Sequence, residues 1–114
     1  MKCRLAQINE WEIVAVEAQF KPSKMAALCA VSLRQLERYF MDRFQQPPGK
    51  WARALRCRLA CDLIAKGWSN KAVAFETHFS NESHLCHEFA YHYGEAPQKF
   101  SPTFLQRTKS ENIA

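Results

Sequence analysis

Hydrogen-bonding side chains recur at helical spacing near the beginning of the segment 32–44. Arg34, Gln35 and Arg38 fall on one arc when this segment is drawn as a helix. Arginine can grip O6 and N7 of guanine through two hydrogen bonds, and glutamine can do the same for N6 and N7 of adenine. The arc is therefore suited to reading base edges, although an ordinary solvated helix face carries the same kinds of residue.

The opposite arc of this segment is apolar, which indicates the buried side of a helix. Ser32 stands at its start with Gln35 three residues later, the spacing of a capping box. The run Gln-Gln-Pro-Pro-Gly at 45–49 ends the helix, because proline cannot continue it. Residues 32–44 are thus predicted to form an amphipathic helix that buries Leu33, Leu36, Phe40 and Phe44.

The same reasoning predicts helices along the rest of the chain. They cover about residues 5–20, 25–29, 50–66, 70–77 and 81–92, and Pro97 opens a last short one. The expected caps are Ser23, Ser69, and Ser80 or Asn81, and the expected stops are Gly67 and Gly94. The first helix is expected to bury Leu5, Ile8, Ile13, Val16 and Phe20. Residues 105–114 are expected to form a frayed tail.

An internal repeat links the two halves of the chain. At an offset of 49 residues, Leu36, Phe40, Phe44, Pro48, Lys50 and Trp51 match Leu85, Phe89, Tyr93, Pro97, Lys99 and Phe100. Before the turn the offset is 48, and Ala26, Ala30, Val31 and Ser32 match Ala74, His78, Phe79 and Ser80. One extra residue just after the second turn explains the shift. The repeated unit has the dimensions of a helix-turn-helix, which lays its second helix in the major groove of DNA.

The second copy carries fewer cations than the first. Ser83, His87 and His92 stand where the first copy has Arg34, Arg38 and Arg43. Its outward arc is expected to hold Ser83, His84, His87 and Tyr91, with Glu82 at the start of the helix. Neutral histidine attracts phosphate little at neutral pH. This arc is compatible with two roles for the helix, which either reads bases weakly or serves only to pack the domain.

Charge is distributed unevenly along the 114 residues, whose net charge is +5. The segment 21–71 carries eleven basic and three acidic side chains, whereas 72–98 has four glutamates and no lysine or arginine. A dense basic block is typical of a surface that meets a phosphate backbone, and also of a solvated surface. No stretch is apolar enough for a transmembrane helix or a signal peptide. Five cysteines without paired spacing fit a reducing cytoplasm.

Three stretches resemble the DNA-binding domain of the AraC/XylS family of transcriptional regulators. They are MAALCAVSLRQLERYF at 25–40, PGKWARALRCRLACDLI at 48–64 and AVAFETHFSNESHLCHEFAYHYGEAPQKF at 72–100. The resemblance covers about residues 8–104. It implies a seven-helix domain with two helix-turn-helix motifs that bind neighbouring major-groove segments and act on transcription.

The resemblance also implies roles for individual residues. Base reading falls to Arg34, Gln35, Arg38, Glu82, Ser83 and His87, with Glu37 as an additional candidate. Phosphate contacts are expected from Ser32, Arg43, Lys50, Lys71 and Ser80, whereas Arg56 matches a structural position of the linker helix. The sequence departs from the family at His78 and Gln45, where glycine is usual, and at His87, where arginine is usual. These departures weaken the expected affinity of the second motif more than its fold.

Two other readings stay open at this stage. A zinc site is conceivable because Cys57 and Cys61 are four residues apart and His84, Cys86 and His87 cluster later. The acidic second half can instead face a protein partner such as RNA polymerase, which leaves one working DNA-binding motif and a degenerate second one. No catalytic motif is present, so an enzyme is not expected.

The expected architecture is therefore all-α, with seven helices arranged as two helix-turn-helix subdomains joined by a long linker helix. The subdomains are expected at 1–47 and 68–104, with the linker helix at 48–67 and the tail at 105–114. The expected partner is double-stranded DNA, with no cofactor, no metal, no membrane and no small-molecule effector bound by this chain.

If His84, His87 and His92 supply the charge that the second motif lacks, DNA affinity should rise as the pH falls from about 7.5 to 6. Histidine gains its proton in this range, and the added charge attracts phosphate. Affinity measured across this range checks the prediction, and a flat profile contradicts it.

Overall fold

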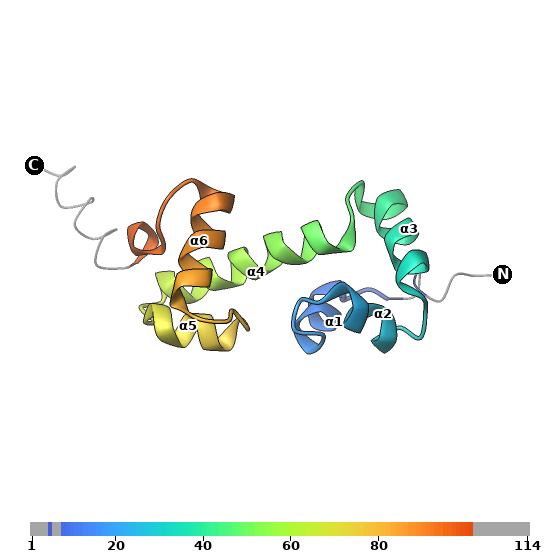
Figure 1. Ribbon diagram of the computed structural model, residues 1–114, viewed down its shortest axis with the longest axis horizontal. Coiled ribbons are helices and arrows are strands. Elements are labelled where there is room, and N and C mark those ends of the chain that lie inside the picture. The colour runs from blue at the N-terminus through green and yellow to red at the C-terminus, as the bar shows by residue number, and fades with distance from the viewer. Residues whose placement is uncertain (1–4, 6–7, 102–114) are drawn as a thin grey trace, which may run out of the picture. The chain divides into compact units, whose positions relative to one another are not determined.

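The computed structural model describes residue 5 and residues 8–101, and this part of the chain is helical without any strand. Its elements are α1 (Trp11–Glu17), α2 (Pro22–Leu28), α3 (Leu33–Phe44), α4 (Pro48–Ala65), α5 (Asn70–Glu76), α6 (Glu82–Tyr93) and the short 3-10 helix η2 (Pro97–Phe100) (Figure 1). The predicted all-α fold is confirmed, with the seventh helix as a 3-10 turn. The predicted tail at 105–114 lies outside the described residues. None of the described helices is long and apolar enough to cross a membrane.

The chain divides into two compact units, Met1–Leu55 and Arg56–Ala114. The division falls within α4, so the beginning of this helix belongs to the first unit and its remainder to the second. The helix itself starts at Pro48, as its first-turn proline predicts. The subdomain limits expected from the sequence, with a separate linker at 48–67, stay a prediction.

The first helix is shorter than the sequence pattern predicts. It covers Trp11–Glu17 instead of 5–20. Gln19 and Phe20 adopt positive φ angles of 56° and 62°, which end the helix. The N–H of Phe20 closes the end by donating to the Ala15 carbonyl at 2.8 Å. The pattern had suggested a longer helix because it contains no proline or glycine before Pro22.

The buried side of α1 also differs from the predicted one. Trp11, Ala15 and Ala18 are buried, whereas Ile13 and Val16 are 51% and 43% exposed. The buried residues follow the helical spacing i, i+4, i+7, and two of them are alanines that allow close packing against α2. Of the predicted anchors, Leu5 and Phe20 are buried, whereas the prediction for Ile13 and Val16 is wrong.

The start of α2 is set by proline and not by serine. Lys21 is the N-cap residue, without a side-chain hydrogen bond, and Pro22 is the first helical residue. Ser23, predicted to cap this helix, lies inside its first turn. Proline suits this position because its fixed φ angle matches the helix and its missing N–H would have no partner there.

The internal repeat is confirmed in the backbone of both helix-turn-helix units. The first helices, α2 and α5, have seven residues each, and the second helices, α3 and α6, have twelve. In the two turns Ala30 and His78 have φ angles of 58° and 62°. The N–H groups of the following residues reach back to the Ala26 and Ala74 carbonyls at 3.0 and 2.9 Å. Both turns therefore use one left-handed residue that is not glycine.

The aromatic cores repeat as closely as the turns. Phe40, Phe44 and Trp51 have ring centroids 4.9, 5.4 and 5.7 Å apart in the first unit. Their counterparts at the offset of 49, Phe89, Tyr93 and Phe100, are 4.7, 5.3 and 5.5 Å apart in the second. Each triplet packs the second helix of its unit against the segment that follows the helix. Phe40 and Phe89 are fully buried at these centres.

The shift in the repeat lies at the start of α6. Ser32 caps α3, but its counterpart in α6 at the offset of 49 is Asn81, whose side chain accepts from the N–H of His84 at 2.8 Å. Of the two predicted caps, Ser80 or Asn81, the structure selects Asn81. Ser80 is thus the inserted residue.

The left-handed turn residues give a first test of the fold. Ala30→Gly should stabilise the protein by up to about 1 kcal/mol, because it relieves a left-handed cost of roughly 1–2 kcal/mol and loses part of that gain to chain entropy. Ala27→Gly, an exposed position inside α2, should instead destabilise by about 0.5–1 kcal/mol. Urea unfolding of both variants measures the difference, and equal losses would contradict the role of the turn.

Candidate nucleic-acid interface

Helix α3 presents its polar arc to solvent as the sequence predicts. Arg34, Gln35 and Arg38 are exposed, whereas Leu36 and Phe40 on the other side are 0% exposed. The prediction that these three polar residues lie on the outward face is confirmed. Their contact with bases is tested by nothing in the structure and stays a proposal.

Leu33 corrects the predicted buried stripe. It is 42% exposed, although it was expected to be inward. Leu33 is the first residue of α3 and directly follows the N-cap residue Ser32. An apolar side chain at this end can contact the methyl group of thymine.

Gln35 has a structural task in the first turn of α3. Its Oε1 accepts from the N–H of Ser32 at 2.8 Å, and its own N–H donates to Ser32 Oγ at 3.1 Å. The predicted capping box is therefore complete. Adenine needs both the carbonyl and the amino group of a glutamine, so base reading by Gln35 competes with the cap. Arg34 and Arg38 are exposed on the same arc.

Helix α6 repeats this design with other side chains. Leu85 and Phe89 are 0% exposed, while Glu82, Ser83 and His87 lie in the open. The predicted outward placement of these three residues is confirmed, and their contact with bases stays a proposal. Tyr91, also expected outward, is 85% exposed.

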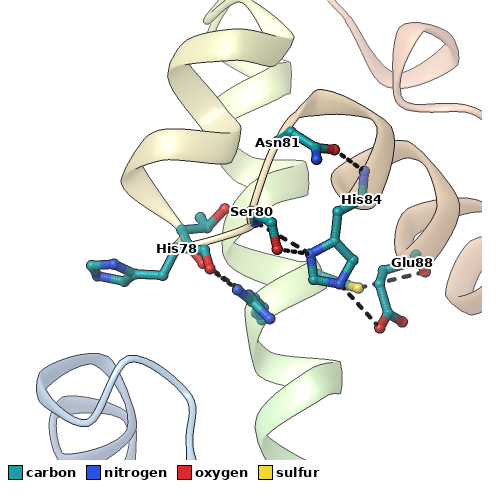
Figure 2. A network of polar contacts seen from close by, with 8 residues as sticks. His78, Ser80, Asn81, His84 and Glu88 are labelled. Atoms are coloured by element: carbon teal, nitrogen blue, oxygen red, sulfur yellow. Dashed lines mark hydrogen bonds and ion pairs between the residues drawn. The ribbon is translucent and has the colours of Figure 1, made fainter.

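His84 lies in a polar network and not on the open arc (Figure 2). Its Nδ1 is 3.2 Å from both the backbone N and the Oγ of Ser80. Its Nε2 is 3.7 Å from a carboxylate oxygen of Glu88, and the two side chains are 33% and 28% exposed. The ring also meets Phe79 edge to face at 5.1 Å between centroids. The prediction that His84 points outward with His87 is therefore wrong, because the ring turns back to the residue before the cap.

The residues expected to contact phosphate are all exposed, namely Ser32, Arg43, Lys50, Lys71 and Ser80. Two of them have part of their polar groups engaged within the protein. The N–H of Ser32 donates to Gln35, and the N–H of Ser80 donates to His84. Arg43 places its guanidinium carbon 5.6 Å from the Phe44 ring centroid. Phosphate contact by these residues remains a proposal.

Comparison with known proteins agrees with this geometry. The model of the helix-turn-helix domain family matches residues 25–102, about two thirds of the chain. The chain belongs to this family. No curated protein matches it significantly in sequence.

Solved structures show the fold of this helix-turn-helix domain. An AraC-type regulator from Chromobacterium violaceum is 22% identical with a TM-score of 0.73, over 90% of this chain and 95% of that one. The DNA-binding domain of AdpA, a global transcriptional factor, is 23% identical with a TM-score of 0.75, over 93% and 96% of the two chains. A probable AraC family regulator from Rhodopseudomonas palustris is 22% identical with a TM-score of 0.61, over 82% of this chain and 91% of that one. The AraC-type architecture predicted from the sequence is confirmed.

Arg56 holds the turn of the second helix-turn-helix. Its Nε donates to the Thr77 carbonyl at 2.8 Å, and its Nη2 donates to the His78 carbonyl. The guanidinium carbon lies 4.0 Å from the centre of the Phe79 ring. Burial lowers the pKa of Arg56, and the nearby Glu88 opposes this shift. These contacts agree with the structural role expected for Arg56.

Three residues of the suggested zinc site, Cys57, His84 and Cys86, have other partners within the protein. Cys57 Sγ lies 3.8 Å from the Glu88 carbonyl, and burial raises the pKa of this thiol to about 11. Asn70 lies 4.0 Å from Cys86 Sγ. Within the described ranges, no group of three or more metal-binding side chains comes together. The suggested combination of Cys57, Cys61, His84, Cys86 and His87 therefore finds no support.

The sequence pattern misplaced two residues of the candidate interface. Leu33 was assigned to the core although it directly follows the cap, and His84 was assigned to the reading arc. The repeat contained the second signal, because His84 lies 49 residues after Gln35, the capping residue of the first motif. At this one position the two motifs therefore both place an acceptor for a backbone N–H before the helix.

The capping role of Gln35 predicts how substitutions change stability. Gln35→Glu should leave the stability near that of the wild type, because glutamate also accepts from the N–H of Ser32. Gln35→Met keeps the size and helix propensity but loses the acceptor, and should lower stability by roughly 0.5–1.5 kcal/mol. Urea unfolding measures both, and a Gln35→Met variant as stable as wild type would show that the cap is irrelevant.

Proposed function

We propose that this chain binds double-stranded DNA sequence-specifically and regulates transcription, with α3 and α6 in successive major grooves. The observation that carries the proposal is the outward face of α3. Arg34 and Arg38 stand exposed on a helix whose other side is anchored by the fully buried Leu36 and Phe40. A helix fixed in this way can present side chains to base edges in one orientation.

The first motif supplies most of the specific contacts in this proposal. Arg34 and Arg38 each form two hydrogen bonds to guanine, while Leu33 contacts a thymine methyl group. Arg43 and Lys50 bind phosphates and fix the register of the helix on the duplex. Gln35 holds the start of the helix, and Ser32 offers its hydroxyl group to a phosphate.

The second motif reads its segment more weakly. Glu82 can accept from N4 of cytosine, and Ser83 and His87 can hydrogen bond to base edges. Lys71 and the Ser80 hydroxyl group are the proposed phosphate contacts of this half. Because α6 carries no lysine or arginine, its contribution depends less on salt than that of α3.

Similar proteins support the proposal. The chain belongs to a helix-turn-helix family, and the related AdpA domain was solved in complex with a target DNA. Family membership also supports the expectation that the chain has no enzymatic activity. A DNA partner and cysteines without disulfides among the described residues favour the cytoplasm as the place of action.

A second candidate function is protein binding by the second unit, with RNA polymerase as the expected partner. The exposed side chains of Phe75 and Tyr91, at 82% and 85%, favour it, because large aromatic residues are enriched where proteins meet. In this case α3 alone binds DNA. The two candidates differ in the number of DNA segments that the chain recognises.

Selection of bound sequences from random DNA decides between the candidates. Two conserved boxes one helical turn apart support two reading helices, and one box supports the second candidate. The salt dependence of affinity gives an independent count, because each neutralised phosphate adds about 0.9 to the slope. If no sequence is enriched, the chain does not read DNA.

Replacement of one reading residue tests the orientation of α3. Arg38→Ala should weaken binding to the selected site by roughly 1–3 kcal/mol and relax the preference at one base position. Arg53→Ala removes an equal charge from the exposed side of α4 and should leave the base preference unchanged. Affinity for a panel of single-base variants measures both effects. An unchanged base preference in Arg38→Ala removes this residue from the reading face.

A further inference from the structure

We infer that His84 is a positioning residue for the second reading helix, and that it acts only while its imidazole ring is neutral. The inference rests on the proposed function, because it concerns how α6 is held for DNA. It assigns to His84 a task different from base reading and from the supply of charge. The contacts of the ring with the residues before α6 carry the argument.

The backbone N–H of Ser80 fixes the state of the ring. An N–H group only donates, so the Nδ1 atom 3.2 Å away must accept with its lone pair. The single ring proton then lies on Nε2, which faces Glu88 Oε1 at 3.7 Å. The Ser80 hydroxyl group, 3.2 Å from the same Nδ1, can donate to it as well. His84 therefore accepts a hydrogen bond at Nδ1 and directs the proton of Nε2 toward the nearby Glu88 carboxylate.

In the first motif the side chain that accepts from a backbone N–H before the helix is a glutamine, which does not titrate. Gln35 Oε1 accepts from the N–H of Ser32 at 2.8 Å, and His84 Nδ1 accepts from that of Ser80 at 3.2 Å. Both acceptors stand at the third residue of a twelve-residue helix. Each ties the beginning of its helix to the chain that leaves the turn. Each second helix thus has a side-chain acceptor near its start. In α3 it is permanent and serves the N–H of the N-cap residue Ser32, and in α6 it is titratable and serves the N–H of Ser80, the residue before the N-cap Asn81.

The elements around His84 connect this cap to the turn. Phe79 meets the His84 ring edge to face, and Arg56 stacks on the same Phe79 while donating to the Thr77 and His78 carbonyls. Figure 2 shows Ser80, Asn81 and His84 where the chain passes from α5 to α6. A loss of the contact between His84 and Ser80 therefore loosens the end of α6 that carries Glu82 and Ser83.

Protonation removes the acceptor for the Ser80 amide, since Nδ1 then carries a hydrogen that it can donate only to an oxygen such as Ser80 Oγ, 3.2 Å away. Among the described groups near the ring, Glu88 on α6 attracts the charged form. Arg56 on α4 opposes it, and the Cys57 thiol stays neutral because burial raises its pKa to about 11. The side chain of His78 points away from the ring (Figure 2). A protonated ring keeps Glu88 Oε1 3.7 Å from its Nε2 but no longer accepts from the Ser80 amide.

The control variant of the test carries the residue that the first motif has at this position, a glutamine. His84→Gln places a glutamine where Gln35 stands in α3 and removes the titration, while His87 and His92 remain in both proteins. Affinity for a duplex selected at pH 7.5 is measured down to about pH 5.5, each protein relative to its own value at pH 7.5. The affinity of wild type should fall by on the order of fivefold relative to that of His84→Gln, which is the effect of losing one hydrogen bond at a helix start.

His84→Ala should bind more weakly than wild type at pH 7.5, and His84→Gln should bind nearly as well as wild type. Superimposed pH profiles of wild type and His84→Gln would overturn the inference. So would a wild-type profile that rises above that of His84→Gln, because His84 would then act through its charge.

Amide exchange provides a measurement without DNA. In wild type the Ser80 N–H should lose its protection from hydrogen exchange between about pH 7.5 and 5.5, after correction for the intrinsic rate. In His84→Gln it should stay protected. Protection that persists in wild type overturns the inference. If selection enriches no DNA sequence, the proposed function fails while this measurement still decides the role of His84.

Discussion

The fully buried phenylalanines of the two second helices are the constraint on which the arrangement depends. Phe40 and Phe89 are 0% exposed, and each packs against at least two further rings of its own unit. Burying a ring of this size stabilises a small domain by roughly 1.5–3 kcal/mol, and rotation of the helix would forfeit that contribution. The outward face of each helix is therefore decided by the core.

The first turn of each second helix has to satisfy unpaired N–H groups while it faces a ligand. The chain separates these tasks by position. The third residue turns back to hold the start of the helix, as Gln35 and His84 do, and the residues beside it remain exposed. A polar residue near a reading end is thus not automatically a reading residue. Whether such a residue is available to a base depends on its hydrogen-bond partner within the protein.

Sequence reasoning predicted the elements that depend on local signals. The capping box at Ser32, the repeat and the buried pair Leu36 and Phe40 were predicted because each follows from a fixed spacing. The prediction for α1 was wrong because two left-handed residues, Gln19 and Phe20, end it without a glycine or proline to signal the turn. Helical projection also assigns a direction to each side chain but not its partner.

The two motifs differ mainly in how their polar side chains respond to protons. Where the first has Arg34, Arg38 and Arg43, whose charges are permanent, the second has one serine and two histidines. The side-chain acceptor at the start of the helix differs in the same way, since it is glutamine in the first motif and histidine in the second. Protonation of His87 and His92 adds charge toward phosphate, whereas protonation of His84 removes an acceptor from the backbone. The response of the second motif to pH is then a difference between two opposing effects, and a net response near zero would hide both. Only a variant that changes one of them, such as His84→Gln, separates attraction for DNA from the order of the helix that meets it.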